Sequence, residues 1–366
     1  MTKINILQMI EQSQVKWKTL GAILIRTKGT KITAGKMKEL HKDNGEIKIF
    51  AGGKTFALVN AEDIPMSDVN HNPSIIVKSR GIIEFEYYDK PFSHKNEMWS
   101  YYSNNDEINI KFIYYFLKQN EQHFQQIGSK MQMPQIATPD TDKFLVPIPP
   151  ISLQQEIVRI LDALTAVTSE LTSELKLRQK QYQYYRDHLL SFGDDVEWKS
   201  LGEVCHNIFS GKNKDRCIDG AYPIYGSTGI IGRTNNFMFE EDRILVARVG
   251  ANAGFVHIAM GKYDVSDNTL IVENMDSISM KYLYYYLKHM NLNQFAKGAG
   301  QPLITGGQLK ALKIPIPPFA EQQRIVEILD KFDRLTHSLS EGLPKEIELR
   351  RKQCEYYREK LLNFPK

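Results

Sequence analysis

Two short motifs in this chain could carry catalysis, and neither is complete. Pro317-Pro318-Phe319 matches the end of the Asn/Asp-Pro-Pro-Tyr/Phe element of adenine methyltransferases, but Ile316 stands where an amide or carboxylate must hold the target amino group. A metal-dependent nuclease could use Pro139-Asp140 with Glu174 and Lys176, but this glutamate and lysine fall on the flank of a predicted coiled coil, distant from any cleft. Neither motif predicts an active site.

Motifs for cofactors and metals are also missing from the sequence. No Gly-x-x-x-x-Gly-Lys-Ser/Thr phosphate loop occurs, and the nine histidines show no His-x-x-x-His or His-x-x-Glu-His spacing. Cys205, Cys217 and Cys354 lack Cys-x-x-Cys spacing, so we expect free thiols. We therefore expect no catalytic residue, no metal and no cofactor in this chain.

A basic segment could instead contact nucleic acid. Residues 26–54 contain eight basic and three acidic residues, a local charge of +5, which suits contacts with phosphates. The candidates within it are Lys28, Lys31, Lys36 and Lys54. The alternative is a solvated basic loop without a ligand. The net charge of +4 for the whole chain permits nucleic-acid binding without indicating it.

Polar residues set among glycines are the other candidates for contacts with DNA. Glycine lets a backbone come close to a groove, while Arg and Asn or Gln can read the edges of guanine and adenine. In the second half of the chain the candidates are Ser227, Thr228, Arg233, Arg248, Asn252, Gln301 and Thr305. Their counterparts by position in the first half include Arg80, Gln132 and Gln135. The competing interpretation is that these residues stabilise turns.

The elements that must position these residues come from an internal duplication. Val15-Lys16-Trp17-Lys18 returns as Val196-Glu197-Trp198-Lys199, and the segment Pro147-Ile148-Pro149-Pro150 to Asp162 returns as Pro315-Ile316-Pro317-Pro318 to Asp330 at a shift of 168. Between these anchors the two halves diverge. Such a repeat fixes the architecture before any local prediction, and it indicates one scaffold that carries two different surfaces.

Each half combines short strands with helices. Runs such as Ser74–Lys78 and Arg243–Arg248 alternate with Gly, Asn and Asp, and each half also contains a helical run around Tyr114 or Tyr284. The pattern predicts two globular α/β domains in a chain of the α+β class, related by an internal two-fold pseudo-repeat.

A long helix is predicted after each Pro-Ile-Pro-Pro turn. Ser152 and Gln155 fit a capping box at the start of the first helix. Apolar residues then recur at heptad spacing, which is typical of a coiled-coil seam. The seam residues are Ile157, Leu161, Leu164, Leu171 and Leu175 in the first helix, and Ile325, Leu329, Phe332 and Leu339 in the second. We expect the two helices to pair as an antiparallel coiled coil.

The second helix contains an insertion. Its C-terminal part matches the first helix at a shift of 172 rather than 168, so four residues entered near Gly342-Leu343-Pro344. We expect Pro344 to kink or interrupt the helix.

A helix of about 40 residues runs about 60 Å, which could hold two domains at the spacing of half-sites about 34 Å apart on DNA. Two similar domains with different surfaces, held by such a helix, suit the recognition of two different short DNA sequences at a fixed separation. The alternative is a helical hairpin that only stabilises the fold.

The order of a variable domain, a Pro-Ile-Pro-Pro turn and a Glu/Gln-Gln-x-Ile-Val-x-Ile-Leu-Asp helix, given twice, resembles the specificity subunits of type I restriction-modification enzymes. The most specific parts are Ile314–Pro318 with Glu321–Val326, the turn Tyr222–Gly232, and Arg243–Gly250. The Ile49–Gly53 turn of the first half departs from the fuller Tyr-Gly-Ser-Thr-Gly type of the second half.

The resemblance implies a non-catalytic subunit that binds a bipartite site on double-stranded DNA, one half-site per domain. It further implies that the helices act as spacer and as docking surface for two methyltransferase subunits, joined by restriction and motor subunits. S-adenosylmethionine, ATP and Mg²⁺ would belong to those partners. The implied segments are a first target recognition domain at 1–150, a helix at 151–192, a second recognition domain at 193–319 and a helix at 320–366.

Two alternatives remain open at this point. Specificity subunits of related enzymes that cut at fixed positions beside a bipartite site share this design, and a coiled-coil adaptor without DNA binding would also be duplicated. Since the N-terminus lacks the apolar core of a signal peptide and no stretch approaches the length of a membrane span, we expect a cytoplasmic protein that does not contact membranes.

Overall fold

The computed structural model describes residues 6–129, 133–298, 300–338 and 340–365. The chain forms two compact units, one of Met1–Glu170 with Ile347–Lys366 and one of Leu171–Glu346. Each unit therefore consists of one globular domain and the parts of the long helices that lie beside it. The division into four segments made from the sequence stays a prediction.

The first unit is built on two small sheets. Its larger sheet has the strand order β2-β8-β5-β6, all antiparallel, and its smaller sheet has the order β4-β3-β7, in which β3 and β7 are parallel. The strands are β1 (Lys16–Thr19), β2 (Ile25–Arg26), β3 (Ile47–Phe50), β4 (Phe56–Val59), β5 (Ser74–Lys78), β6 (Glu84–Tyr88), β7 (Phe92–His94), β8 (Trp99–Tyr102) and β9 (Leu145–Ile148). The helices are α1 (Ile6–Gln12), α2 (Leu20–Ile23), α3 (Ala34–Leu40), α4 (Ile110–Gln119), α5 (Glu121–Gly128) and α6 (Thr138–Asp142).

The second unit repeats this topology. Its sheets have the orders β11-β17-β14-β15 and β13-β12-β16, and β12 and β16 are again the parallel pair. The strands are β10 (Glu197–Ser200), β11 (Cys205–Ser210), β12 (Tyr222–Gly226), β13 (Gly229–Thr234), β14 (Arg243–Ala247), β15 (Val256–Ala259), β16 (Asp264–Val265), β17 (Thr269–Asn274) and β18 (Lys313–Ile316). The α-helices of its globular domain are α8 (Met280–His289) and α9 (Gly306–Lys310). The repeat seen in the sequence is thus a repeat of fold.

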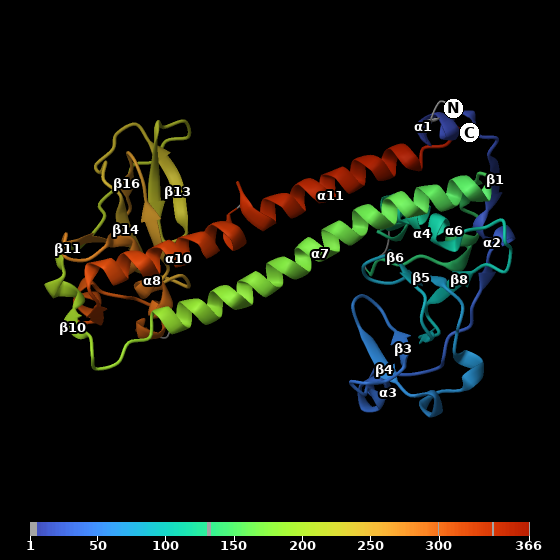
Figure 1. The fold of residues 1–366 in the computed structure, drawn as a ribbon, viewed down its shortest axis with the longest axis horizontal. Coiled ribbons are helices and arrows are strands. Elements are labelled where there is room, and N and C mark those ends of the chain that lie inside the picture. The colour runs from blue at the N-terminus through green and yellow to red at the C-terminus, as the bar shows by residue number, and fades with distance from the viewer. Residues whose placement is uncertain (1–5, 130–132, 299, 339, 366) are drawn as a thin grey trace. The chain divides into compact units, whose positions relative to one another are not determined.

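The helical run around each tyrosine pair covers the larger sheet of its unit. In the first unit α4 packs on β5 and β6 (Figure 1) and buries Phe112, Ile113 and Leu117. Strand β5 is buried along its whole length because neighbouring strands flank it and α4 covers one face. The spacing of apolar residues in α4 places them on one side of the helix, as a helix over a sheet requires.

The Pro-Ile-Pro-Pro turns end short strands that close each domain. Strand β9 pairs antiparallel with β1, with Trp17 opposite Pro147, and β18 pairs with β10, with Trp198 opposite Pro315. Each long helix therefore leaves its domain beside the strand where that domain begins.

Helix α7 (Ile151–Leu189) is continuous over 39 residues. It begins one residue before Ser152, so the predicted Ser152–Gln155 capping box is wrong in position. The carbonyl of Pro150 accepts hydrogen bonds from the backbone amides of Leu153 (2.9 Å) and Gln154 (3.1 Å) instead. A proline is tolerated at this place, because Pro150 precedes the first residue of α7 and its missing N–H removes no hydrogen bond of the helix.

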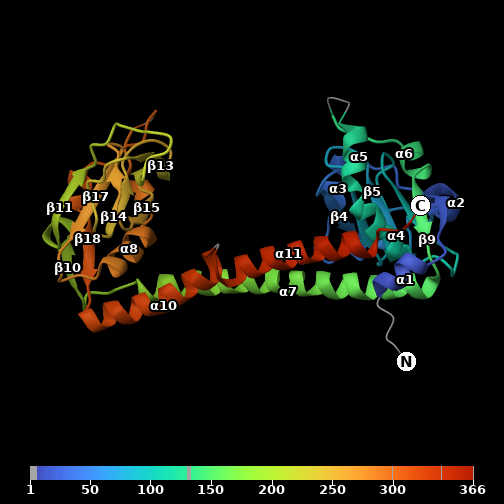
Figure 2. The same cartoon turned by 90° about the horizontal axis from the view of Figure 1, so that it is seen from above.

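Within each unit α7 lies against a second helix in the antiparallel direction (Figures 1 and 2). In the first unit Thr168 Oγ1 lies 3.6 Å from Cys354 Sγ of α11 (Gly342–Leu361), while Leu161 and Leu361 belong to the same core nearer the domain. In the second unit the rings of Tyr182 and Tyr185 contact His337 and Phe332 of α10 (Phe319–His337), respectively.

The seam residues lie where these helices pack. Ile157, Leu161, Ile325 and Leu329 are buried, and Leu164, Leu171, Leu175 and Phe332 are half-buried. Leu339 lies outside the described residues.

The second helix is interrupted, but not at the proline. Helix α10 ends at His337 and α11 begins at Gly342, so Pro344 lies in the first turn of α11, where a proline is tolerated. Gly342 has a φ of +78°, and a Cβ there would approach the carbonyl oxygen of Arg334 to 2.4 Å. The glycine, rather than the proline, permits the break.

Among the described residues, no helix is both long and apolar enough to cross a membrane.

Candidate DNA interface

The basic segment of the first unit is largely engaged in ion pairs. Lys28 lies 3.8 Å from Asp68, and Lys36 lies 2.8 Å from Glu39. Acidic residues outside the segment also offset its local charge, because Lys42 pairs with Asp63 and Arg26 with Asp142. Lys31 and Lys54 are exposed and have no ion pair within the described part of the chain. Among the four candidate lysines, these two are the ones most available to a phosphate.

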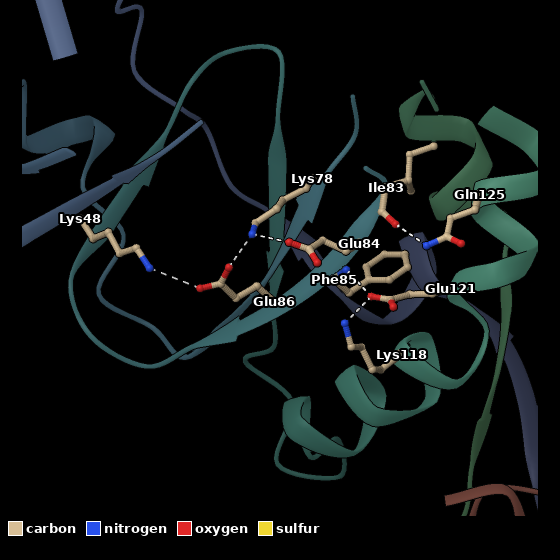
Figure 3. Close-up of polar contacts among 9 residues, drawn as sticks. All are labelled: Lys48, Lys78, Ile83, Glu84, Phe85, Glu86, Lys118, Glu121 and Gln125. Carbon is tan, nitrogen blue, oxygen red and sulfur yellow. Dashed lines mark hydrogen bonds and ion pairs between the residues drawn. The ribbon is translucent and has the colours of Figure 1, made fainter. Parts of the chain in front are cut away.

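A partly buried charged network joins the two sheets of the first unit (Figure 3). Lys78 of β5 has a side chain that is 7% exposed, and its Nζ lies 2.5 Å from Glu84 and 2.8 Å from Glu86. Glu86 also lies 3.3 Å from Lys48 of β3. Burial alone would lower the pKa of Lys78, but the hydrogen bonds to the two glutamates outweigh it and raise that pKa. Lys78 therefore stays charged.

Lys48 is enclosed further by aromatic rings. Its Nζ lies 4.2 Å from the ring centroid of Phe50, 5.0 Å from that of Phe56 and 5.1 Å from that of Tyr88. Such cation–π contacts hold an ammonium in place. Lys48 thus contributes to the junction of the sheets rather than to a free basic surface.

Helix α5 covers the open edge of β6 (Figure 3). The backbone amide of Phe85 donates to Glu121 Oε1 (2.8 Å), and Gln125 Nε2 donates to the carbonyl of Ile83 (3.1 Å). These contacts satisfy backbone groups that an edge strand would otherwise leave unpaired.

Two equivalent hairpin turns carry sequence-predicted residues. Lys54 lies in the turn between β3 and β4, and Ser227 and Thr228 form the turn between β12 and β13. Gly53 and Gly229 adopt positive φ angles of +63° and +93° in these turns. The structure therefore brings these candidates to corresponding places in the two domains.

Arg80 and Gln135 come together in the first unit. They form an isolated backbone bridge, beside which the amide of Gly81 donates to the carbonyl of Pro134 (2.9 Å). Arg80 is exposed, and Gln135 is half-buried. Gln132 lies outside the described residues.

The corresponding loop of the second unit holds Arg248. The amide of Gly250 donates to the carbonyl of Pro302 (2.9 Å), as Gly81 does to Pro134. Arg248 is half-buried, and its Nη1 donates to Ser210 Oγ over 3.4 Å. Its buried Nε has no hydrogen-bond partner in the described chain, and neither has the buried Thr269 Oγ1. Asn252 and Gln301 are exposed beside this loop.

Arg233 and Thr305 have structural partners. Arg233 Nε and Nη2 donate to the carbonyls of Gly220 (2.5 Å) and Ala221 (2.8 Å). Thr305 is the N-cap of α9, and its Oγ1 accepts from the amide of Gln308 (3.2 Å). For these two residues the contacts favour turn and helix stabilisation over contact with DNA.

Sequence reasoning missed an aromatic stack in the second unit. The ring of His257 on β15 stacks with the rings of Tyr225 and Phe255, with centroid distances of 5.6 Å to each. Burial lowers the pKa of His257 to about 4. Its place on the edge strand matches that of Glu86, since His257 lies opposite Leu245 as Glu86 lies opposite Ile76. The same point of the scaffold is therefore charged in one domain and aromatic in the other.

The carboxylates of the nuclease-like pattern are engaged elsewhere. Asp140 Oδ2 accepts from the amide of Ala137 (2.7 Å) at the start of α6, and Glu174 pairs with Arg178 on α7 (2.7 Å). No group of three or more His, Cys, Asp or Glu among the described residues could hold a metal ion.

Comparison with known proteins identifies the duplicated scaffold. The family model described as a type I restriction modification DNA specificity domain matches residues 14–179 and again 193–349. The chain therefore belongs to the family of type I restriction-modification DNA specificity proteins, and its function is that of a DNA specificity subunit.

Two relatives from Escherichia coli illustrate the similarity. The chain is 34% identical to the EcoR124I/EcoR124II specificity subunit, over 98% of this chain and 96% of that protein. It is 37% identical to the EcoprrI specificity subunit over 64% of each.

The fold also agrees with solved structures. The type I restriction-modification S subunit from M. genitalium superposes with a TM-score of 0.68 at 19% identity, over 97% of this chain and 98% of that one. A chain from a study of type I system assembly and conformational transition superposes with a TM-score of 0.54 at 16% identity, over 97% and 98%. At these identities the match shows the fold.

Proposed function

We propose that each recognition domain reads one half of a bipartite DNA target, and that α7 sets the distance between the halves. The supporting observation is the repeat of one topology with different side chains at equivalent points, such as Glu86 against His257 and Lys54 against Ser227 and Thr228. One scaffold that presents two different surfaces suits the recognition of two half-sites with different base sequences.

The two domains would use different chemistry. In the first domain Lys31, Lys54 and Arg80 are exposed cations that suit phosphates or guanine edges. In the second domain the surface combines Arg248 with neutral polar groups at Ser227, Thr228 and Asn252. The stretch of 39 helical residues in α7 would act as the spacer, since a helix of that length spans about 58 Å.

Partner docking is supported by a second apolar stripe on both helices. Leu177 and Tyr184 lie seven residues apart on α7 and are 61% and 67% exposed. Leu349 and Tyr356 repeat them on α11 and are 49% and 55% exposed. Exposed apolar surface of this kind marks protein contacts, and its duplication suits two copies of one partner.

The partners we propose are two methyltransferase subunits, with restriction and motor subunits added to them. S-adenosylmethionine, ATP and Mg²⁺ would be bound by those subunits, and this chain would be non-catalytic. Since the proposed target is double-stranded DNA, the proposed place of action is the cytoplasm.

The test is a map of methylated adenines in cells that express the methyltransferase subunits with or without this chain. We expect a bipartite motif, two half-sites with a spacer of fixed length, that disappears when the chain is omitted. Unchanged methylation would contradict the proposal and favour an adaptor. Cleavage at fixed positions beside the motif by the complete enzyme would favour the related class of bipartite-site enzymes.

A further inference from the structure

An aspartate at the same place on each helix holds the domain beside it. In the first unit Asp162 of α7 accepts a hydrogen bond from Tyr115 Oη (2.6 Å) and pairs with Lys111 Nζ (2.8 Å), both on α4. In the second unit Asp330 of α10 accepts from Tyr285 Oη (2.6 Å) and pairs with Lys281, both on α8. We call these two sets the aspartate latches.

A buried glutamine provides a second attachment on each helix. Gln154 Oε1 accepts from the amide of Asn109 (2.9 Å), the N-cap of α4, and Gln154 Nε2 donates to the carbonyl of Pro149 (2.7 Å). Gln322 Oε1 accepts from the amide of Ser279 (2.8 Å), the N-cap of α8, and Gln322 Nε2 donates to the carbonyl of Pro317 (2.9 Å). Both glutamines are at most 1% exposed.

The spacing of the two attachments restricts rotation of the domain. Gln154 precedes Asp162 by eight residues, as Gln322 precedes Asp330, which is about 12 Å along a helix. A domain tied to a helix at two such points cannot turn about either one alone. The side chains between them, among them Leu161 and Leu329, are buried in the same cores.

Apolar side chains of α4 and α7, and of α8 and α10, also share a core in each unit, for example Phe112 with Leu161 and Tyr282 with Leu329, so the latches are not the sole attachment. A partly buried ion pair adds little net stability, because desolvation offsets its attraction, but it penalises any arrangement that separates the charges. Burial and the hydrogen bond to the aspartate raise the pKa of Tyr115 and of Tyr285. Like an unperturbed tyrosine, both phenols are protonated at physiological pH and can donate to the aspartate.

We infer that the two aspartate latches fix the orientation of each recognition domain on its helix, and that they thereby set the stringency for the spacer length of the DNA target. The inference rests on the proposed function. Lys111, Tyr115, Asp162 and their counterparts are positioning residues in it, since they act through the orientation of the domains rather than by contact with bases.

The test uses the full chain assembled with its methyltransferase subunits. Methyl transfer is measured on duplexes that carry the native spacer or a spacer one base pair longer or shorter, with both half-sites kept. The variants are Tyr115→Phe with Tyr285→Phe, which removes two hydroxyls and keeps both rings, and Asp162→Asn with Asp330→Asn. The matched control is Glu156→Gln with Glu321→Gln, since within the described part of the chain each glutamate pairs only with an arginine of its own helix, Arg159 or Arg324.

We expect the preference for the native spacer to fall by about tenfold or more in both latch variants, with the half-site words unchanged and the control like the wild type. An unchanged spacer preference in the tyrosine variant would overturn the inference, as would a change in the half-site words. If the wild-type complex itself showed no bipartite preference, the proposed function would fail first, so the two failures are distinguishable.

Discussion

Arg233 and Arg248 are both arginines among glycines, yet their surroundings give them different roles. The guanidinium of Arg233 is held by two backbone carbonyls. That of Arg248 makes one long hydrogen bond to Ser210, and its Nε has no partner in the described chain. A buried donor without a partner is costly. A DNA acceptor that engages the guanidinium would offset part of that cost.

We predict that Arg248→Ala weakens discrimination at one position of one half-site by about 1 to 3 kcal/mol, the worth of a good bidentate contact with a base. Arg233→Ala should instead destabilise the second unit and leave the recognised word unchanged. Methylation rates on duplexes that vary each base pair of both half-sites would measure this. Equal loss on all sequences would show that Arg248 contacts phosphate, and no loss would exclude it from the interface.

The ends of the two long helices dock in equivalent ways. Phe192, just past α7, packs on Tyr282 of α8 at a centroid distance of 6.4 Å, and Phe364, just past α11, packs on Phe112 of α4 at 5.9 Å. Trp17 Nε1 donates to the carbonyl of Pro365 (3.1 Å). The chain after α11 thus joins the first unit through non-covalent contacts. The chain after α7, by contrast, continues directly into the second domain.

Phe364 is 6% exposed. Phe364→Ala should therefore destabilise the first unit by about 3 to 5 kcal/mol, the usual range for removing a buried phenylalanine side chain. Urea denaturation measures the loss. The control is Tyr356→Ala on the same helix, whose side chain is 55% exposed and should cost far less. Equal effects of the two variants would contradict the docking described for Phe364.

At this scale the sequence predicted the periodic features well. The seam from Ile157 to Leu329 and the duplicated strands follow from spacing that one chain displays twice. The position of the helix break was predicted at Pro344, but the backbone breaks before Gly342. The latch residues were not predicted, although Gln154 and Asp162 are the first and last residues of the motif that returns as Gln322 to Asp330. The repeat marks these residues, but only the tertiary packing against α4 and α8 shows what they contact.

For the whole molecule, duplication was the feature of the sequence that carried most information. It predicted two like domains with unlike surfaces, and the repeated topology of the sheets confirms that plan. The bases that each surface reads were beyond prediction, since they depend on which side chains reach the groove and on how readily the DNA deforms. His257 in its aromatic stack and Glu86 in its charged network, which stand at equivalent points, show how far two copies of one scaffold have diverged.

The central claim, one half-site per domain, is tested most directly by exchanging residues 193–319 for the corresponding domain of a relative with a different target. Methylated adenines are then mapped in cells that express the chimera with the methyltransferase subunits. The account predicts a motif in which one half-site is replaced while the other half-site and the spacer length are kept. A motif altered in both halves, or in neither, would contradict it.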